Sequence, residues 1–165
     1  MGRWVHAAAA ASIAMVSVQS VAATRSDCWS AQEISAAKVR DLQSMLMVAG
    51  LRCRFSSVDV LVSYNKFVNA NRTAIVEVNS RLKTHFNLAY GPIEGQRSYD
   101  RFTTALANVY GAAGSGDEGC RDMAELAESA AAANGSDVAL LAVAEQRGIQ
   151  PELPTLRCEM TFAAK

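Results

Sequence analysis

Apolar residues recur at steps of three and four along much of this chain, which is the spacing of an amphipathic helix. The pattern is clearest over residues 57–89, where it runs from Val60 to Ala89. At 1.5 Å per residue such a helix would be roughly 48 Å long. We therefore expect it to form the backbone of the fold, with or without a kink. Asn71 falls at the centre of its apolar face, which favours a hydrogen-bonded core asparagine over a ligand-binding group.

Other segments carry helix signals of their own. The sequence Ser30-Ala31-Gln32-Glu33 has the form of a capping box, in which the serine hydroxyl and the glutamate carboxylate satisfy the first amide groups of a helix. A helix is expected from there to about Arg52. Three shorter helices are expected over residues 96–110, 120–133 and 137–147. The chain is thus predicted to be all-α, an irregular bundle of four to five helices with an extended C-terminal tail, stapled by disulfides.

Three segments interrupt the helical pattern. Gly91 to Gly95 (GPIEG) is predicted to form a turn, and residues 111–119 (GAAGSGDEG) a flexible linker. After Pro151 and Pro154 the tail cannot be helical. Apolar and polar residues then alternate along the tail, as on the two sides of an extended chain. We expect its apolar side to lie against the bundle and to be attached there through a cysteine; that side consists of Leu156, Cys158, Met160 and Phe162.

The first residues have the pattern of a secretory leader. Arg3 precedes an apolar run over residues 7–18, and Val21-Ala22-Ala23 places small residues at the −3 and −1 positions. This predicts a signal peptide over residues 1–23, cleaved after Ala23 or one residue earlier. An uncleaved anchor is less favoured, because the run is rich in alanine and shorter than the ~20 strongly apolar residues of a membrane-spanning helix. Residues 24–165 then form a single domain.

Four cysteines follow the leader: Cys28, Cys53, Cys120 and Cys158. An even number in an exported chain predicts disulfides. If residues 30–52 form one helix, Cys28 and Cys53 lie roughly 30 Å apart, too far for a bond. Of the two remaining pairings, we prefer Cys53 with Cys120 and Cys28 with Cys158. The chain has no CxxC motif and only one histidine after the leader, so neither a metal site nor a cofactor is expected.

Charge is balanced over the chain but not along it. The formal net charge is zero overall, with a net of +4 over residues 24–110 and of −5 over residues 111–165. A nucleic-acid-binding protein normally has a basic excess, so no nucleic-acid partner is expected. The asymmetry favours two halves that dock on each other; a separate basic site for a partner is the alternative.

Candidate chemistry gathers around residues 91–101 (GPIEGQRSYDR), expected to be a loop between two helices. Glu94 and Asp100 are weak candidates for acid–base catalysis. A weaker one is the histidine at position 85, which sits at the edge of an apolar stripe and is expected to have a structural role. Ligand binding is expected of three neighbouring residues, Arg97, Tyr99 and Arg101.

These observations favour an exported, periplasmic or secreted protein that acts by binding rather than by catalysis, with an unidentified protein or envelope ligand as partner. Once the leader is removed, no stable membrane span is expected. Two alternatives remain. One is an acid–base hydrolase of an envelope polymer such as peptidoglycan, which would need two carboxylates across a cleft. The other is a structural or stress-related export product without a discrete site.

Overall fold

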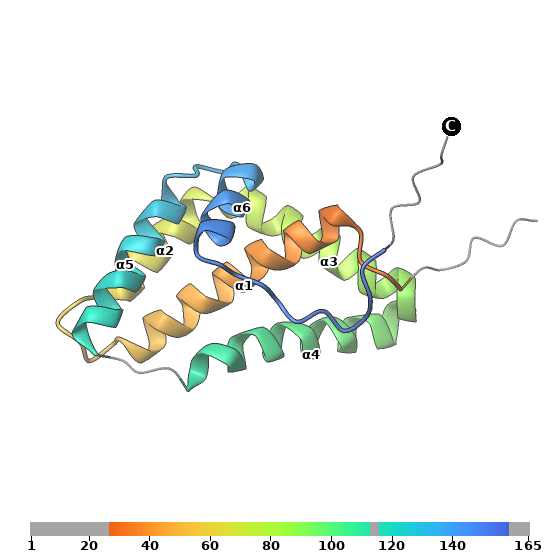
Figure 1. Ribbon diagram of the computed structural model, residues 1–165, viewed down its shortest axis with the longest axis horizontal. Coiled ribbons are helices and arrows are strands. Elements are labelled where there is room, and N and C mark those ends of the chain that lie inside the picture. Colours follow the sequence, from red (N-terminus) through yellow and green to blue (C-terminus); the bar gives the residue numbers. More distant parts are fainter. Residues whose placement is uncertain (1–26, 113–115, 159–165) are drawn as a thin grey trace, which may run out of the picture.

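The computed structural model describes residues 27–112 and 116–158, and within them the protein is all-α (Figure 1). There are six helices in the described residues rather than four or five. Their bounds are α1 (Ala31–Arg52), α2 (Val60–Ala70), α3 (Arg72–Tyr90), α4 (Pro92–Gly111), α5 (Asp117–Ala131) and α6 (Asp137–Gln146). The predicted fold class is confirmed. No helix in this part of the chain is both long and apolar enough to cross a bilayer.

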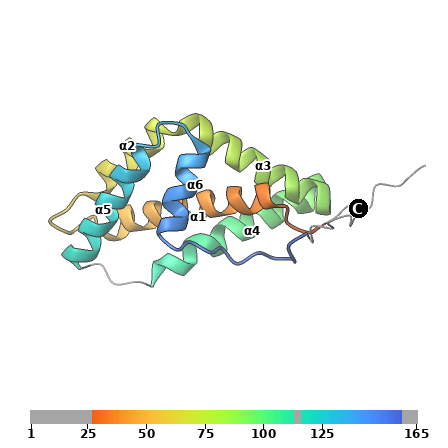
Figure 2. The same ribbon diagram turned by 45° about the horizontal axis from the view of Figure 1, so that its top comes forward.

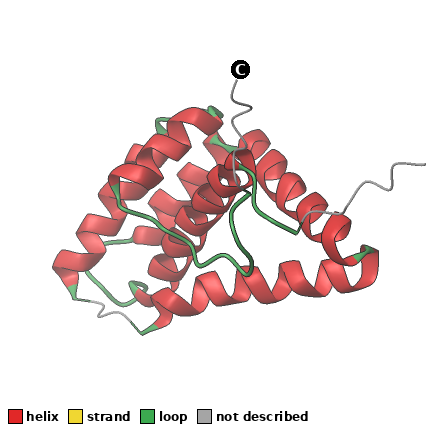
Figure 3. Ribbon diagram, turned by 45° about the vertical axis from the view of Figure 1, so that its right-hand side comes forward, coloured by secondary structure: helices red, strands yellow, loops and turns green. Residues whose placement is uncertain are grey.

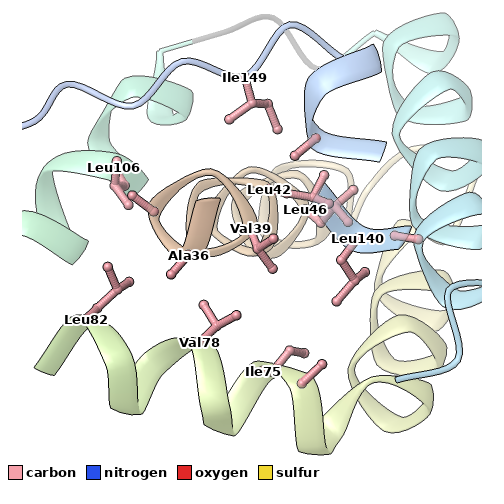
Figure 4. Packing of buried hydrophobic residues seen from close by; sticks show 14 of the residues in the cluster. Ala36, Val39, Leu42, Leu46, Ile75, Val78, Leu82, Leu106, Leu140 and Ile149 are labelled. Atoms are coloured by element: carbon pink, nitrogen blue, oxygen red, sulfur yellow. The ribbon is translucent and has the colours of Figure 1, made fainter. Parts of the chain in front are cut away.

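Helix α1 is the centre of the bundle and packs against all five other helices. Figure 4 shows its side chains surrounded by residues of α3, α4 and α6, which point toward it. The predicted capping box is confirmed: the Glu33 amide donates to Ser30 Oγ at 3.4 Å, and the Ser30 amide donates to Glu33 Oε2 at 2.7 Å. The buried α1 residues include Ala36, Val39, Leu42 and Leu46.

The long helix predicted over residues 57–89 is two helices, α2 and α3, which meet at Asn71. Asn71 is fully buried; its Nδ2 donates to the carbonyl oxygens of Phe67 and Ala130, each at 2.9 Å, and its Oδ1 accepts from the Gly135 amide at 2.8 Å. The core role predicted for this residue is therefore confirmed. The helix breaks because its two parts pack on different partners: α2 packs mainly on α5, whereas α3 packs on α4, which it meets at one end (Figure 2).

The turn predicted over residues 91–95 is wrong, because α4 begins at Pro92 rather than near residue 96. Gly91 alone separates α3 from α4, with φ at 80°, a value that favours glycine. Proline suits the first position of a helix, where no amide donor is needed. Gly95 brings α4 close to the end of α3: a Cβ there would lie 2.6 Å from the Phe86 carbonyl oxygen. Residues 91–101 are thus almost wholly helical.

The linker predicted over residues 111–119 is shorter in the structure. Helix α4 includes Gly111, and α5 begins at Asp117, three residues before the predicted start. The Asp117 carboxylate accepts hydrogen bonds from the Ser56 and Ser57 hydroxyls at 2.9 and 2.8 Å, which ties the start of α5 to the loop after α1. Helix α6 matches its prediction to within one residue.

The residues after α6, 148–158, form an extended C-terminal segment that crosses α1 and runs beside α4 (Figures 1 and 3). It is not a strand: its one bridge pairs Arg157 with Trp29. The predicted orientation is wrong at Leu156, which is 85% exposed. The reason is that the Leu156 carbonyl oxygen accepts from the Trp29 amide at 2.9 Å, so main-chain pairing rather than side-chain alternation sets the orientation. Met160 and Phe162 lie outside the described residues.

Both predicted disulfides are confirmed. Cys28 pairs with Cys158 and Cys53 with Cys120, with Cα–Cα distances of 4.9 and 5.7 Å. The first bond ties the C-terminal segment to the start of α1, and the second ties the end of α1 to α5. The chain-entropy model gives about 3–5 kcal/mol of stabilisation for closing loops of this length.

Ion pairs connect the basic and acidic parts of the chain. Lys38 Nζ lies 2.8 Å from Glu145 Oε1, and Lys66 pairs with Glu128. Each pair joins a cation from residues 24–110 to a carboxylate from residues 111–165, as expected if the two halves dock on each other. The predicted signal peptide, residues 1–23, lies outside the described residues.

Candidate functional site

A groove lies between the first half of α4, the end of α3 and the C-terminal segment. It encloses about 550 Å³ and is open to solvent. Phe86 and Phe102 are buried in the core and form its floor, while Leu153 and Pro154 of the C-terminal segment close one side. Glu94, Arg101 and Glu152 supply its polar rim. We call it the first groove.

A second groove of about 380 Å³ continues along α4, and it shares Ala105 and Glu152 with the first. Its walls are apolar side chains of α1, α4 and the C-terminal segment, among them Met45, Leu106, Val109 and Ile149. Together the two grooves extend along α4 from Glu94 to Tyr110, a length of roughly 24 Å at the helical rise per residue. We refer to the pair as the α4 groove.

The sequence of the C-terminal segment explains why a groove remains open there. Gly148, with φ at 73°, ends the turn after α6, and Ile149 is buried. Pro151 and Pro154 then prevent helix and remove two amide donors. Among the described residues, no main-chain hydrogen bond joins residues 150–155 to the bundle. Between its two fixed ends the segment is held by side-chain contacts: Leu153 packs against the core, and the Thr155 hydroxyl donates to the Asp27 carbonyl oxygen.

Two of the candidate residues, Glu94 and Arg101, line the first groove. Arg101 donates to Glu94 Oε1 at 2.6 Å and to Ser98 Oγ at 2.9 Å. The hydrogen bond from Arg101 lowers the pKa of Glu94; burial opposes this, and the charges of Arg101 and Arg97 add to the lowering. A carboxylate held in its charged form in this way is a poor general acid at neutral pH.

The other candidates from the same stretch lie elsewhere on α4. Asp100 is exposed, accepts a hydrogen bond from Gln96 at 2.8 Å, and does not line the first or the second groove. Arg97 is exposed as well, with Nη1 3.7 Å from Glu94 Oε2. Tyr99 is buried, and its hydroxyl donates to Asn79 Oδ1 at 3.0 Å. The structure therefore does not gather the five candidate residues of this stretch into one site.

His85 is part of the core rather than of the groove. It is 5% exposed, its Nδ1 lies 3.0 Å from Glu33 Oε1, and its ring lies against Trp29 with 4.2 Å between ring centroids. Burial raises the pKa of Glu33, but the hydrogen bonds from Ser30 and the neighbouring His85 outweigh it, so that the pKa is lowered overall. The histidine thus connects the capping box of α1 to α3, in agreement with the structural role expected for it.

Asp41 was not singled out from the sequence, although it is the most unusual polar residue of the α4 groove. It is only 4% exposed, it lines the second groove, and its Oδ1 accepts a hydrogen bond from the Tyr110 hydroxyl at 2.9 Å. Burial raises the pKa of Asp41, and the bond from Tyr110 offsets part of that rise. The available signal was a single carboxylate within the apolar part of the first helix, next to Leu42 and one turn before Met45.

The described residues contain no group of three histidine, cysteine or acidic side chains that could hold a metal ion. Comparisons with protein-family models, with curated proteins and with solved structures give no match. The α4 groove is therefore the feature of the molecule that points to a function.

Proposed function

We propose that this chain is an exported, non-enzymatic binding protein of the cell envelope that holds an elongated, largely apolar small molecule in the α4 groove. The observation that carries the proposal is the groove: two adjoining hollows of about 550 and 380 Å³, which share Ala105 and Glu152 and are lined by apolar side chains with charged ones among them. Ligand sites in proteins have this size range and this distribution of polar groups.

Export is supported by the leader pattern of residues 1–23 and by the two disulfides. Disulfides form and persist in oxidising compartments such as the periplasm or the outside of the cell. Ligands encountered there include amphiphiles released from membranes, whose apolar chains suit a groove floored by Phe86 and Phe102.

The hydrolase alternative has less support. It would require Glu94 and Asp100 to act as a pair across a cleft, yet only Glu94 lines the α4 groove, and Arg101 keeps its carboxyl group charged. A glycosidase needs one carboxyl group with a raised pKa facing the other. A purely structural protein would not need the groove.

Binding can be tested with three soluble amphiphiles of equal chain length, n-decanol, n-decylamine and decanoate, by isothermal titration calorimetry on the oxidised, purified protein. We expect at least one of them to bind with 1:1 stoichiometry. Ala105 is exposed and lines both parts of the groove, so Ala105→Trp should weaken that binding about tenfold or more by filling the space.

The matched control is Ala142→Trp, which adds the same side chain at an exposed position of α6 that does not line the α4 groove. It should bind like the unaltered protein. Failure of all three probes to bind, or equal affinities of the two tryptophan variants, would overturn the proposal.

A further inference from the structure

The charges along the α4 groove are not balanced. In the first groove, the Arg101 guanidinium is paired with Glu94, and in the second, Arg147 Nη2 lies 2.7 Å from Asp122 Oδ2. Both cations of the lining therefore already have a carboxylate partner. Two carboxylates of the lining, Asp41 and Glu152, form no ion pair with any described residue. The charge left without a partner in the groove is thus negative.

Of these two carboxylates, Asp41 is the more enclosed. It projects from the central helix α1, it is 96% removed from solvent, and the Tyr110 hydroxyl donates to one of its oxygens, Oδ1. Its other oxygen, Oδ2, accepts no hydrogen bond from a described residue and keeps some access to solvent, and the residue lines the second groove. An ionised carboxylate buried without a cation destabilises a fold. A ligand that supplies the missing cation would remove that penalty.

The surroundings of Asp41 define the rest of such a ligand. Met45, Leu106 and Val109 line the second groove together with Asp41, and the first groove, lined by Phe102 and Phe86, adjoins it at Ala105. A cationic head on Asp41 would therefore direct an apolar chain along α4, beneath the C-terminal segment. Glu152, which lines both grooves from that segment, adds a second negative charge beside this path.

We infer that the α4 groove selects amphiphilic cations, with a primary ammonium group bound to the buried Asp41 and an apolar chain lying toward Phe102 and Phe86. The ammonium group has the donors that Oδ2 lacks, and hydrogen bonds between two charged groups are the stronger ones. This inference rests on the proposed function and specifies which ligands that function serves.

The three decyl probes test it on the unaltered protein, because they share one chain and differ in head-group charge. We expect n-decylamine to bind about tenfold or more tightly than n-decanol, since a charge-assisted hydrogen bond in a poorly solvated site contributes at least that factor. Decanoate should bind most weakly. This ranking requires no variant, so it stays informative if a substitution at Asp41 prevents folding.

Two substitutions then assign the preference to Asp41. Asp41→Asn keeps the shape and an acceptor for Tyr110 but removes the charge; it should abolish the advantage of decylamine and leave decanol binding within about twofold. Tyr110→Phe removes the hydrogen bond and keeps the carboxylate, so the preference for the amine should persist. Asp100→Asn, on the exposed side of α4, is the matched control and should change neither affinity.

The outcomes separate the two proposals. If decanol binds in the groove and decylamine binds no better, the inference about charge is overturned and the proposed binding function stands. A preference for the amine that survives Asp41→Asn overturns the assignment of the ammonium group to Asp41. If no probe binds, both proposals are overturned together.

Discussion

Single residues decide several features of this fold that periodicity could not predict. Gly95 is an example: within the sequence GPIEG it indicates a turn, whereas in the structure it is the contact point between α4 and the end of α3. Asp41 is another, because a hydrophobic pattern marks which side of α1 is buried but not whether a carboxylate on that helix lines a groove. The role of each residue is set by a contact with another helix: Gly95 lies against the end of α3, and Asp41 against Tyr110 of α4.

Replacing Gly95 by alanine tests the close approach of α3 and α4. The added Cβ would lie 2.6 Å from the Phe86 carbonyl oxygen and 2.7 Å from the Asn87 Cα, and backbone atoms cannot move aside as side chains do. We expect Gly95→Ala to lower the free energy of unfolding by about 1–3 kcal/mol, measured by urea denaturation. Gly119→Ala, in α5 with open space around it, is the matched control and should be neutral or stabilising by up to about 1 kcal/mol. Equal effects of the two substitutions would contradict this packing.

The difference in stability between the Asp41→Asn variant and the unaltered protein should depend on pH in a defined direction. Burial raises the pKa of Asp41 above its ordinary value of 3.8 in the folded protein. Folding is therefore favoured while this group is protonated, and that contribution is lost as the pH rises through the raised pKa. Asp41→Asn should accordingly be more stable than the unaltered protein at pH 7 and nearly equal to it below pH 3.8. Thermal unfolding at both pH values measures this; a less stable variant at pH 7 would contradict the sign.

At the scale of elements, the sequence predicts helices well and their ends poorly. The capping box at Ser30 and the serine cap at Ser136 are local signals, and both helices begin where these signals indicate. The break between α2 and α3 has no such signal, because apolar residues continue in phase through Asn71. Its cause is tertiary: the two helices pack on α5 and α4, and Asn71 satisfies main-chain groups from three segments.

Asn71→Ala tests whether this residue holds the junction of α2, α3 and α5. The substitution removes three hydrogen bonds and leaves the Gly135 amide without its partner, whereas the Ala130 carbonyl keeps the hydrogen bond from the Ala133 amide at 3.2 Å. We expect a loss of about 2–4 kcal/mol in the free energy of unfolding, since each of the three hydrogen bonds contributes roughly 0.5–1.5 kcal/mol and the truncation leaves a gap in the core. Asn108→Ala, at an exposed position of α4, should change it by less than about 0.5 kcal/mol. A loss at Asn71 no larger than that at Asn108 would refute the role of the asparagine.

At the scale of the whole molecule, one disulfide joins the first and last described segments through Cys28 and Cys158, and the other joins the end of α1 to α5. The length of the helix over residues 30–52 excludes only the Cys28–Cys53 pairing. The preference between the two remaining pairings came from placing Cys53 at the far end of that helix and Cys28 at its start. The α4 groove did not follow from the sequence: its walls come from α1, α3, α4 and the C-terminal segment, and only the packed molecule brings these together. Of the residues expected to bind a ligand, Arg101 alone lines it.

The two disulfides should have separable effects. Cys28 and Cys158 fix the segment that forms one wall of the groove, whereas Cys53 and Cys120 join α1 to α5 away from it. Replacing either pair by serine should lower the free energy of unfolding by about 2–5 kcal/mol. Only the Cys28→Ser/Cys158→Ser variant should also weaken binding of the amphiphile, by about tenfold or more. Calorimetry on both variants, at a temperature where each is folded, measures this, and an equal loss of binding in the two would contradict it.

The most direct test of the central claim is to locate a bound amphiphile by amide chemical-shift mapping of the ¹⁵N-labelled, oxidised protein titrated with n-decylamine. If the amine binds in the α4 groove, the largest amide shifts should fall in residues 94–110 of α4 and in residues 148–156 of the C-terminal segment, two stretches far apart in sequence. Shifts are also expected around Asp41 on α1. Shifts confined to α2 and α5, or no shifts at saturating amine, would contradict it.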